Sequence, residues 1–387
     1  MIPYGRQEIS QQDIDAVIAV LKSEYLTQGS VVPRFEDSVS NYCLAKYAIA
    51  VNSATSALHI ACLALGVGDG DQVWTSSITF VASANCALYC GATVDFVDIN
   101  PQTYNMCIGQ LEEKLIKAEK YGKLPKVLIP VHLSGQSCDM SGIFKLSQRY
   151  GFKIIEDASH AIGGKYNGEP IGNCRYSDIT IFSFHPVKII TTGEGGMAVT
   201  NNAKLAKHMC LLRSHGICNV ADDMQAQPTN EIWNYQQIDL GFNYRMTDIQ
   251  AALGISQMTR LAEFVLTRNV IADRYNKLLN EFPLQTPHHP QNCYSSYHLY
   301  VIRLNLNEIS KTQRQVHDAF HAKKIMVNLH YIPVYRQPYF EKMGFKVGYC
   351  PLAEQYYSEA ISLPIYPKLT QEHQDKVVSV LREMLST

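Results

Sequence analysis

The chain has 387 residues, of which 46% are hydrophobic and 18% are charged, and its formal net charge at pH 7 is -1. This length is enough for two domains with full cores, and the composition excludes a disordered chain. A nearly neutral chain without a basic run lacks the field that draws in nucleic acid, so we expect small-molecule chemistry.

The cysteines and the apolar runs favour a cytoplasmic protein. The 11 cysteines are odd in number and include no Cys-x-x-Cys pair. Cys86 and Cys90 lie one helical turn apart in an apolar stretch, which favours buried free thiols over a metal pair. The N-terminus lacks the apolar core of a signal peptide, and no apolar run approaches membrane-spanning length. We therefore expect no disulfide framework, no metal site and no membrane segment.

The first predicted element is a helix that begins after Ser10 and ends near Ser23. Ser10 followed by Asp13 resembles a capping box, and apolar residues then recur at helical spacing. A loop at 25–29 follows, after which short apolar strands alternate with helical patterns. We predict strands at 48–51, 94–97, 127–131, 152–155, 179–183 and 197–200.

This alternation predicts an α/β fold with a mostly parallel sheet and helices on both faces. In such sheets ligands bind beyond the carboxyl ends of the strands. Asn52, Asp157 and Ser183 each follow or end a predicted strand. The three predicted strand ends therefore indicate one ligand site at the same edge of the sheet.

The remainder of the chain predicts a second, smaller unit. The sequence is helical from 246 to 282, with Gly254 as a weak interruption, and three prolines at 283–290 break the pattern. Strands at 297–304 and 325–330 and a closing helix near 371–384 follow. We expect a large α/β domain at 1–250, then a linking helix and a small α+β domain at 251–387.

Thr55 and Ser56 are candidates for a phosphate site. They come directly after a predicted strand, at the start of a helix, where free N–H groups and small hydroxyls bind phosphate. Simple N-capping explains them equally well. Ser183 could add a further hydroxyl to the same phosphate.

Lys188 and Asp157 are the two residues with the most specific chemistry. Lys188 adjoins a glycine-rich turn at 191–196, and Asp157 ends a predicted strand. Pyridoxal phosphate (PLP) needs a lysine that holds its aldehyde as a Schiff base and a carboxylate that keeps its ring nitrogen protonated. In isolation, Asp157 could be a helix cap and Lys188 a surface charge.

Two nearby side chains admit both a structural and a functional interpretation. His160, three residues after Asp157, is by itself more often a structural histidine, but it would contact the ring if this turn faces a cofactor. Phe80 could stack on a flat ring, and core packing is equally compatible with its position.

Five motifs, taken in order, resemble the DegT/DnrJ/EryC1/StrS family of sugar-nucleotide aminotransferases, which have the fold-type I PLP-dependent architecture. The motifs lie at 52–58, 156–161, 182–188, 192–196 and 241–246, and the likeness covers essentially the whole chain. The resemblance implies a homodimer with shared active sites. It implies that Lys188 is the catalytic Schiff-base lysine and that the cofactor is bound by Thr55, Ser56, Phe80, Asp157, His160, Ser183, Lys188 and Asn243, with Asn243 reaching the phosphate of the neighbouring subunit.

The two ends of the chain are most similar to family members of pseudaminic acid biosynthesis, which aminate C4 of a UDP-4-keto sugar with L-glutamate. The supporting stretches lie at 2–7, 25–29, 327–333 and 360–364. By this likeness the nucleotide-sugar site would contain Tyr4, Glu24, Tyr25, Leu26, Thr27, Ala54, Asn328, Leu329, His330 and Tyr331.

Two alternatives stay open from the sequence, and a third is disfavoured. The chain could aminate another UDP- or dTDP-keto sugar, or it could be a PLP-binding regulatory protein without turnover. Sugar dehydratases of the same family replace the Schiff-base lysine with histidine, so Lys188 argues against that activity.

Overall fold

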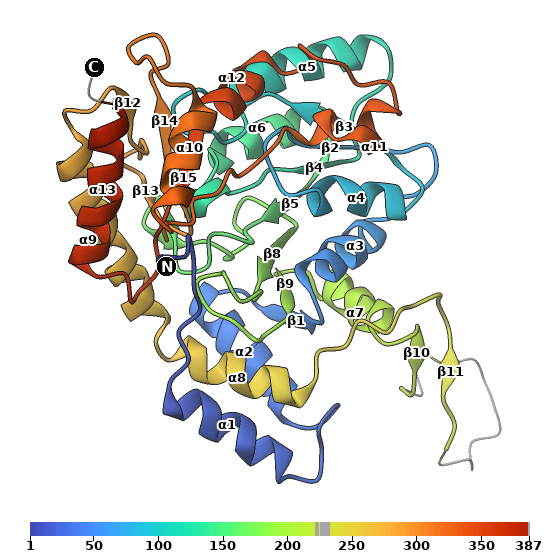
Figure 1. Cartoon of the computed structure of the whole chain (residues 1–387). Helices are drawn as coiled ribbons and strands as arrows, with labels where there is room; N and C mark the ends of the chain where they lie inside the picture. The colour runs from blue at the N-terminus through green and yellow to red at the C-terminus, as the bar shows by residue number, and fades with distance from the viewer. Residues whose placement is uncertain (221–223, 225–232, 386–387) are drawn as a thin grey trace.

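A computed structural model of the chain describes residues 1–220, 224 and 233–385 (Figure 1). Its largest element is a seven-stranded sheet with the order β1-β9-β8-β5-β4-β2-β3. Strand β9 is antiparallel to both β1 and β8, while the remaining neighbours pair in parallel. This confirms the predicted mostly parallel sheet. The strands are β1 (Tyr47–Val51), β2 (Gln72–Ser76), β3 (Thr93–Val97), β4 (Val127–Ile129), β5 (Lys153–Asp157), β8 (Ile179–Ser183) and β9 (Gly196–Thr200).

Helices cover both faces of this sheet, as predicted. Successive side chains of a strand point to opposite faces. Ile49 and Ile155 face a core shared with α3, α4 and α7, whereas Ala50 and Ile154 face cores shared with α2, α8, α5 and α6. The strands are therefore buried from both sides, as parallel sheets require. These helices are α2 (Val31–Cys43), α3 (Ala54–Ala64), α4 (Ala82–Tyr89), α5 (Ile108–Lys120), α6 (Met140–Tyr150), α7 (Ala203–Leu212) and α8 (Asp248–Met258).

The N-terminal helix α1 (Gln11–Leu21) confirms the predicted capping box of Ser10 and Asp13. Asp13 is fully buried and accepts hydrogen bonds from Gln257 Nε2 at 2.8 Å and Arg260 Nη2 at 2.7 Å. The pairing with Arg260 compensates the buried charge. Helix α1 is thereby fixed to the end of α8.

The single long helix expected at 246–282 is wrong. The structure has α8 and then α9 (Leu261–Leu279), with the break at Thr259 and Arg260, where Arg260 turns toward α1. Gly254 does not interrupt α8, because it serves close packing: an added Cβ would lie 2.6 Å from Phe35 Cζ of α2.

A second sheet lies in the C-terminal part of the chain, with the order β12-β14-β15. The closing helix α13 (Gln371–Leu385) is confirmed, and it packs with α9 and α10 (Gln313–Ala322) on a core that also contains Ile2. The predicted strand at 325–330 is wrong, because this segment forms only isolated bridges, Ile325 with Ile2 and Asn328 with Ser362. The strands are β12 (Leu284–Gln285), β14 (Tyr300–Leu304) and β15 (Ala360–Leu363), and the short helices are η1 (Leu133–Gly135), η3 (Val334–Arg336), α11 (Pro338–Glu341) and α12 (Pro351–Glu359).

Two smaller sheets complete the described structure. One joins β13 (Cys293–Tyr294), β6 (Lys165–Tyr166) and β7 (Glu169–Pro170). The other pairs β10 (Ile217–Cys218) with β11 (Gln236–Gln237), and Figure 1 shows it as an arm that projects from the body beside α7. In the described residues, every helix falls short of the length and apolarity needed to cross a membrane.

Candidate active site

The three strand ends singled out by the sequence meet at one edge of the large sheet. Val51 of β1 and Ser183 of β8 both pair with Gly196, the first residue of β9. Asp157 lies at the end of the neighbouring strand β5, opposite Ile181 of β8. The edge therefore brings the start of α3, Ser183 and Asp157 together.

Asp157 is buried and held by two donors. Its Oδ2 accepts a hydrogen bond from the Ser83 hydroxyl at 2.6 Å, and its Oδ1 accepts one from the Ser159 backbone N–H at 3.1 Å. Only 4% of the residue is exposed. A buried carboxylate has to be compensated by donors or a cation, and a protonated ring nitrogen is such a partner.

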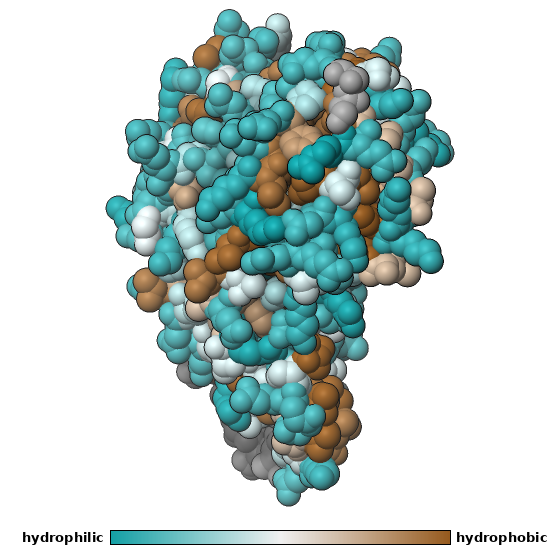
Figure 2. Space-filling view, turned by 60° about the vertical axis from the view of Figure 1, so that its left-hand side comes forward, coloured by the Kyte–Doolittle hydropathy of each residue, from teal (hydrophilic) through white to brown (hydrophobic). Residues whose placement is uncertain are grey.

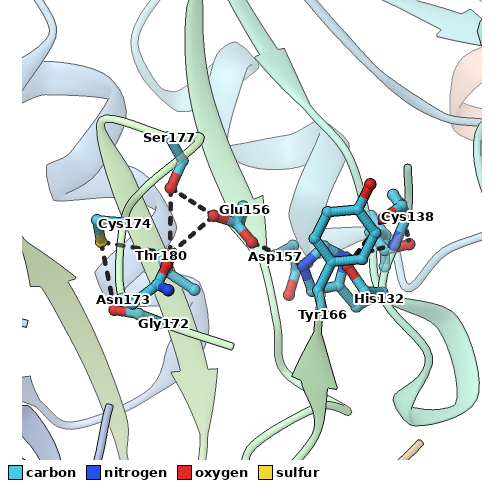
Figure 3. Close-up of polar contacts among 12 residues, drawn as sticks. His132, Cys138, Glu156, Asp157, Tyr166, Gly172, Asn173, Cys174, Ser177 and Thr180 are labelled. Atoms are coloured by element: carbon cyan, nitrogen blue, oxygen red, sulfur yellow. Dashed lines mark hydrogen bonds and ion pairs between the residues drawn. The ribbon is translucent and has the colours of Figure 1, made fainter. Parts of the chain in front are cut away.

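The strand that carries Asp157 is fixed from its other side by Glu156. Figure 3 shows the Glu156 carboxylate between Ser177 and Thr180 on one side and His132 on the other. His132 Nε2 lies 2.8 Å from Glu156 Oε2, and the Cys138 N–H donates to His132 Nδ1 at 3.2 Å. Because Nδ1 accepts, Nε2 carries the proton that binds Glu156. The His132 backbone N–H also donates to the Asp157 carbonyl at 3.0 Å, so this network fixes the end of β5.

His160 lies beside Asp157 and bonds Tyr331. The Ser134 N–H donates to His160 Nδ1 at 3.3 Å, so His160 Nε2 carries the proton toward the Tyr331 hydroxyl, 3.2 Å away. Burial holds the pKa of His160 well below its usual range, and the charges of Lys188 and His330 act in the same direction. His160 is therefore a neutral imidazole at pH 7.

Lys188 is half-buried in the turn that follows β8. Its backbone N–H donates to the His185 carbonyl at 2.9 Å, and the turn is closed by Thr191 and Thr192, which both donate to the Phe184 carbonyl. Burial lowers the pKa of Lys188 to about 8, against the opposing influence of Asp157. Among the residues that the structure describes, no acceptor hydrogen-bonds to Lys188 Nζ. The amine is thus available to an added group and partly neutral near pH 7.

The start of α3 forms a cradle at the other end of the site. Ser53 caps the helix by accepting from the Ser56 N–H at 3.1 Å, and the Ser56 hydroxyl donates to Asn52 Oδ1 at 2.6 Å. The N–H groups of Ala54 and Thr55 have no acceptor within the described part of the chain. A helix N-terminus with free N–H groups suits a phosphate. The N-cap of α3 is thus Ser53, and neither Thr55 nor Ser56 caps the helix, while a phosphate site at Thr55 and Ser56 stays a prediction.

Gly196 keeps this cradle in place. A Cβ at this position would lie 2.4 Å from the Ser53 carbonyl carbon and 2.5 Å from the Ala54 nitrogen. Only a glycine permits β9 to approach the start of α3 this closely. Taken together, a helix start with free N–H groups, a half-buried lysine without a hydrogen-bond acceptor in the described residues and a buried carboxylate at a strand end fit PLP.

The predicted sugar-site residues fall into two groups. Tyr4 packs on His330, with ring centroids 5.3 Å apart, and Tyr331 packs on Phe80 at 6.2 Å. Asn328 Nδ2 lies 3.4 Å from His330 Nε2, and Leu329 lies between these two residues in the chain. Burial raises the pKa of Tyr4 and of Tyr331, so both phenols are neutral donors. This first group lies beside His160 and Lys188, and Phe80, 58% exposed, is open to a ligand rather than packed in the core.

The second group, Glu24–Thr27, is exposed and attached to α8. Thr27 bridges Thr247, and the Leu26 carbonyl accepts from the Asp248 N–H at 2.9 Å. Within the described ranges, no hydrogen bond, ion pair or ring contact joins this loop to the first group. Ala54 stays with the start of α3, and Asn243, also exposed, lies near it: its carbonyl accepts from Asn52 Nδ2 at 3.3 Å.

Sequence reasoning missed four residues of this site: Thr79, Ser83, Ser134 and His298. His298 is buried 4.3 Å from the His160 ring, and its Nδ1 has no partner in the described structure. Ser83 follows the flagged Phe80 by three residues, and their shared turn was the one available signal. Thr79 directly precedes Phe80 and shares this signal, whereas Ser134 and His298 reach the site through segments without a distinctive pattern.

Known proteins resemble the chain over nearly its whole length. Residues 7–382 match the DegT/DnrJ/EryC1/StrS aminotransferase family. The chain is 36% identical to UDP-4-amino-4,6-dideoxy-N-acetyl-beta-L-altrosamine transaminase of Campylobacter jejuni, over 99% of this chain and 98% of that protein. Two solved structures are similar: Helicobacter pylori PseC, an aminotransferase of pseudoaminic acid biosynthesis, with TM-score 0.90 and 28% identity over 99% of both chains, and the PMP-form of the putative sugar aminotransferase Spr1654 of Streptococcus pneumoniae, with TM-score 0.89 and 29% identity over 99% of both chains.

Proposed function

The chain belongs to the DegT/DnrJ/EryC1/StrS aminotransferase family and is a PLP-dependent sugar aminotransferase; from this premise we propose its substrates. It transfers the amino group of L-glutamate to C4 of a UDP-4-keto-6-deoxy-N-acetylhexosamine. The products are 2-oxoglutarate and UDP-4-amino-4,6-dideoxy-N-acetyl-β-L-altrosamine, a step of pseudaminic acid biosynthesis. The likeness to the Campylobacter transaminase over nearly the whole of both chains carries this choice of sugar.

Lys188 is the catalytic residue of the proposal. Bound PLP supplies an electron sink for the carbanion that deprotonation creates. With a pKa of about 8, Lys188 Nζ is partly neutral at pH 7, so it can remove the proton from Cα of glutamate. In the return half of the reaction the same atom delivers a proton to C4 of the sugar. Because both substrates use one lysine in turn, we expect ping-pong kinetics.

The other cofactor residues divide by the part of PLP that they would hold. Asp157 would face the ring nitrogen, His160 and Phe80 would contact the ring, and Thr55 and Ser183 would hold the phosphate. Ser56 would contribute through the helix start, since its hydroxyl is bonded to Asn52. The Asp157 carboxylate would keep the ring nitrogen protonated, and the neutral His160 would add no competing charge.

The nucleotide sugar would bind against Tyr4, Ala54 and Asn328–Tyr331. Tyr331 is oriented by the proton on His160 Nε2, so its own hydroxyl proton is free to donate to the substrate. The exposed loop Glu24–Thr27 would complete the site only if it comes from a second subunit. This separation within one chain supports shared sites.

We infer a homodimer from the separation of Glu24–Thr27 from the other sugar-site residues and from exposed apolar surface. On the arm, Trp233 is 72% and Leu240 75% exposed, and α1 exposes Ile14, Ile18 and Leu21 along one side. Figure 2 shows apolar residues gathered at the narrow lower end of the molecule, the end where Figure 1 places the arm and α1. Surfaces of this kind are commonly covered by a partner. Asn243 of the partner subunit would then reach the phosphate.

Two further expectations complete the proposal. We further propose the division into domains at 1–250 and 251–387, which assigns one principal sheet to each domain and places the boundary inside α8. A cytoplasmic location is supported by the cysteines, which are all free thiols.

The test is incubation of the purified protein with glutamate and a panel of 4-keto UDP- and dTDP-sugars. We expect release of 2-oxoglutarate and an amino sugar whose C4 stereochemistry NMR identifies as L-altro. Spr1654, a putative sugar aminotransferase for which no sugar is named, is almost as similar in fold as PseC, so the fold alone does not select the sugar. Conversion of dTDP-sugars alone would refute the UDP assignment, and binding of PLP without 2-oxoglutarate release would favour a regulatory protein.

A further inference from the structure

Ser83 is a buried side chain that hydrogen-bonds directly to the Asp157 carboxylate. Its Oγ lies 2.6 Å from Asp157 Oδ2, and the residue is completely buried at the start of α4. The Cys86 thiol, one turn later, donates to the Ser83 carbonyl at 3.4 Å. Ser83 is therefore held in place by its own helix.

The Asp157 carboxylate sets the direction of the hydrogen bonds around Ser83. An ionised carboxylate accepts but does not donate, so Ser83 must give its only hydroxyl proton to Asp157. The Thr79 hydroxyl, 2.8 Å from Ser83 Oγ, must then donate to Ser83. Thr79 is 2% exposed, so water does not compete for either hydroxyl. The result is a buried relay from Thr79 to Ser83 to Asp157.

With this relay in place, the Asp157 carboxylate can still accept a hydrogen bond from a cofactor. Oδ1 is bound by the Ser159 N–H and Oδ2 by Ser83, and each carboxylate oxygen can accept a second hydrogen bond. A donor to a carboxylate stabilises its ionised form, and an ionised carboxylate keeps a neighbouring ring nitrogen protonated. The Ser83 N–H also donates to the Phe80 carbonyl at 3.2 Å, so one turn sets both Asp157 and the ring-facing Phe80.

We propose that Ser83 is a positioning residue of the transamination, which holds the Asp157 carboxylate ionised and in one orientation toward the ring nitrogen of the cofactor. The proposal rests on the placement of Asp157 in the proposed function, but it does not depend on which sugar is aminated.

The experiment compares Ser83→Ala with wild type in two measurements that require no sugar. The first is the Kd of the amine form of the cofactor, PMP, which is not held by Lys188 and depends on the ring contacts. The second is the single-turnover rate with glutamate, followed by the absorbance of the bound cofactor. Loss of a hydrogen bond to a charged group predicts about a 10- to 100-fold weaker Kd and a slower rate of similar size. Values within about threefold of wild type would overturn the proposal.

A double-mutant cycle shows whether Ser83 acts through Asp157. In an Asp157→Asn background we expect Ser83→Ala to have almost no further effect on the PMP Kd, because its acceptor has already lost its charge. Additive losses would assign Ser83 a purely structural role and overturn the proposal. Ser147→Ala, a buried serine of α6 whose hydroxyl bonds only its own helix, is the control for removing a buried hydroxyl.

Ser83→Cys keeps the test decisive if Ser83→Ala does not fold. A thiol is a weaker donor of similar shape, so we expect an intermediate loss, and a wild-type Kd would again contradict the proposal. If Asp157→Asn itself leaves the PMP Kd unchanged, the placement of Asp157 is wrong and the proposal fails with it. If the relay behaves as expected but no UDP-sugar is converted, only the choice of substrate fails.

Discussion

Gly196→Ala tests the phosphate cradle more directly than replacement of any of its polar residues. The added Cβ would lie 2.4 Å from the Ser53 carbonyl carbon, whereas ordinary contacts begin at 3.4 Å. All three nearest atoms belong to the backbone of Ser53 and Ala54, so no side chain can rotate away. The start of α3 must therefore move by about 1 Å relative to β9.

A displacement of this size has a predictable cost. Hydrogen bonds between N–H groups and oxygen span only about 2.7–3.2 Å, so a shift of about 1 Å breaks those that the helix start would make to phosphate. Each bond to a charged group contributes about 1.5–3 kcal/mol. We expect PLP affinity to fall by about 10- to 100-fold per bond lost, and the apoprotein to lose about 1–3 kcal/mol from overpacking.

The assay is fluorescence titration of the apoprotein with PLP, together with a thermal melt of the apoprotein. Gly109→Ala is the matched control, since nothing lies within 4 Å of an added Cβ there and it lies in α5. We expect this control to bind PLP normally and to be slightly stabilised. Wild-type PLP affinity in Gly196→Ala would refute the view that the start of α3 holds the phosphate.

Three further predictions concern the lysine, pH and assembly. Lys188→Ala should fold, lose the absorbance of lysine-bound PLP and lose about 10²- to 10⁴-fold in 2-oxoglutarate release, whereas the exposed Lys145→Ala should not; retained turnover would contradict the catalytic assignment. Burial lowers the pKa of His330 to about 3 in the folded protein. The unfolded imidazole titrates near about 6.5, so between these two values the unfolded state binds more protons than the folded state. The stability of the apoprotein should therefore fall as the pH falls through this window. Melting temperatures from about pH 7 to pH 5 should decline less steeply in His330→Gln, and parallel slopes would contradict this account. Trp233→Ser with Leu240→Ser should shift sedimentation toward a monomer, while Tyr121→Ser, exposed at the end of α5, should not.

The regular elements could be predicted because their patterns are local. The capping box at Ser10 and the short apolar strands each determine their own structure, and the order of strands and helices implies a parallel sheet. The same local reasoning failed at Arg260 and at 325–330. The break before α9 is set by the buried Asp13, far away in sequence, and the segment at 325–330 is placed between Ile2 and Ser362.

The residues of the candidate site divide in the same way. Lys188 and Asp157 could be proposed because a lysine beside a glycine-rich turn and an aspartate at a strand end carry a specific chemical meaning, and the comparison with the family confirmed the cofactor. Ser83, Thr79 and His298 could not, since a serine or histidine acquires its role only from the partner that folding places beside it.

The sequence by itself thus determined the fold class and the cofactor and singled out Lys188 as the candidate Schiff-base lysine, because these depend on local periodicity and on side-chain chemistry. Tertiary structure alone decided the direction of the Thr79–Ser83–Asp157 relay, the neutral state of His160 and the close approach at Gly196. These depend on burial and on distances between segments far apart in the chain, which no local pattern encodes.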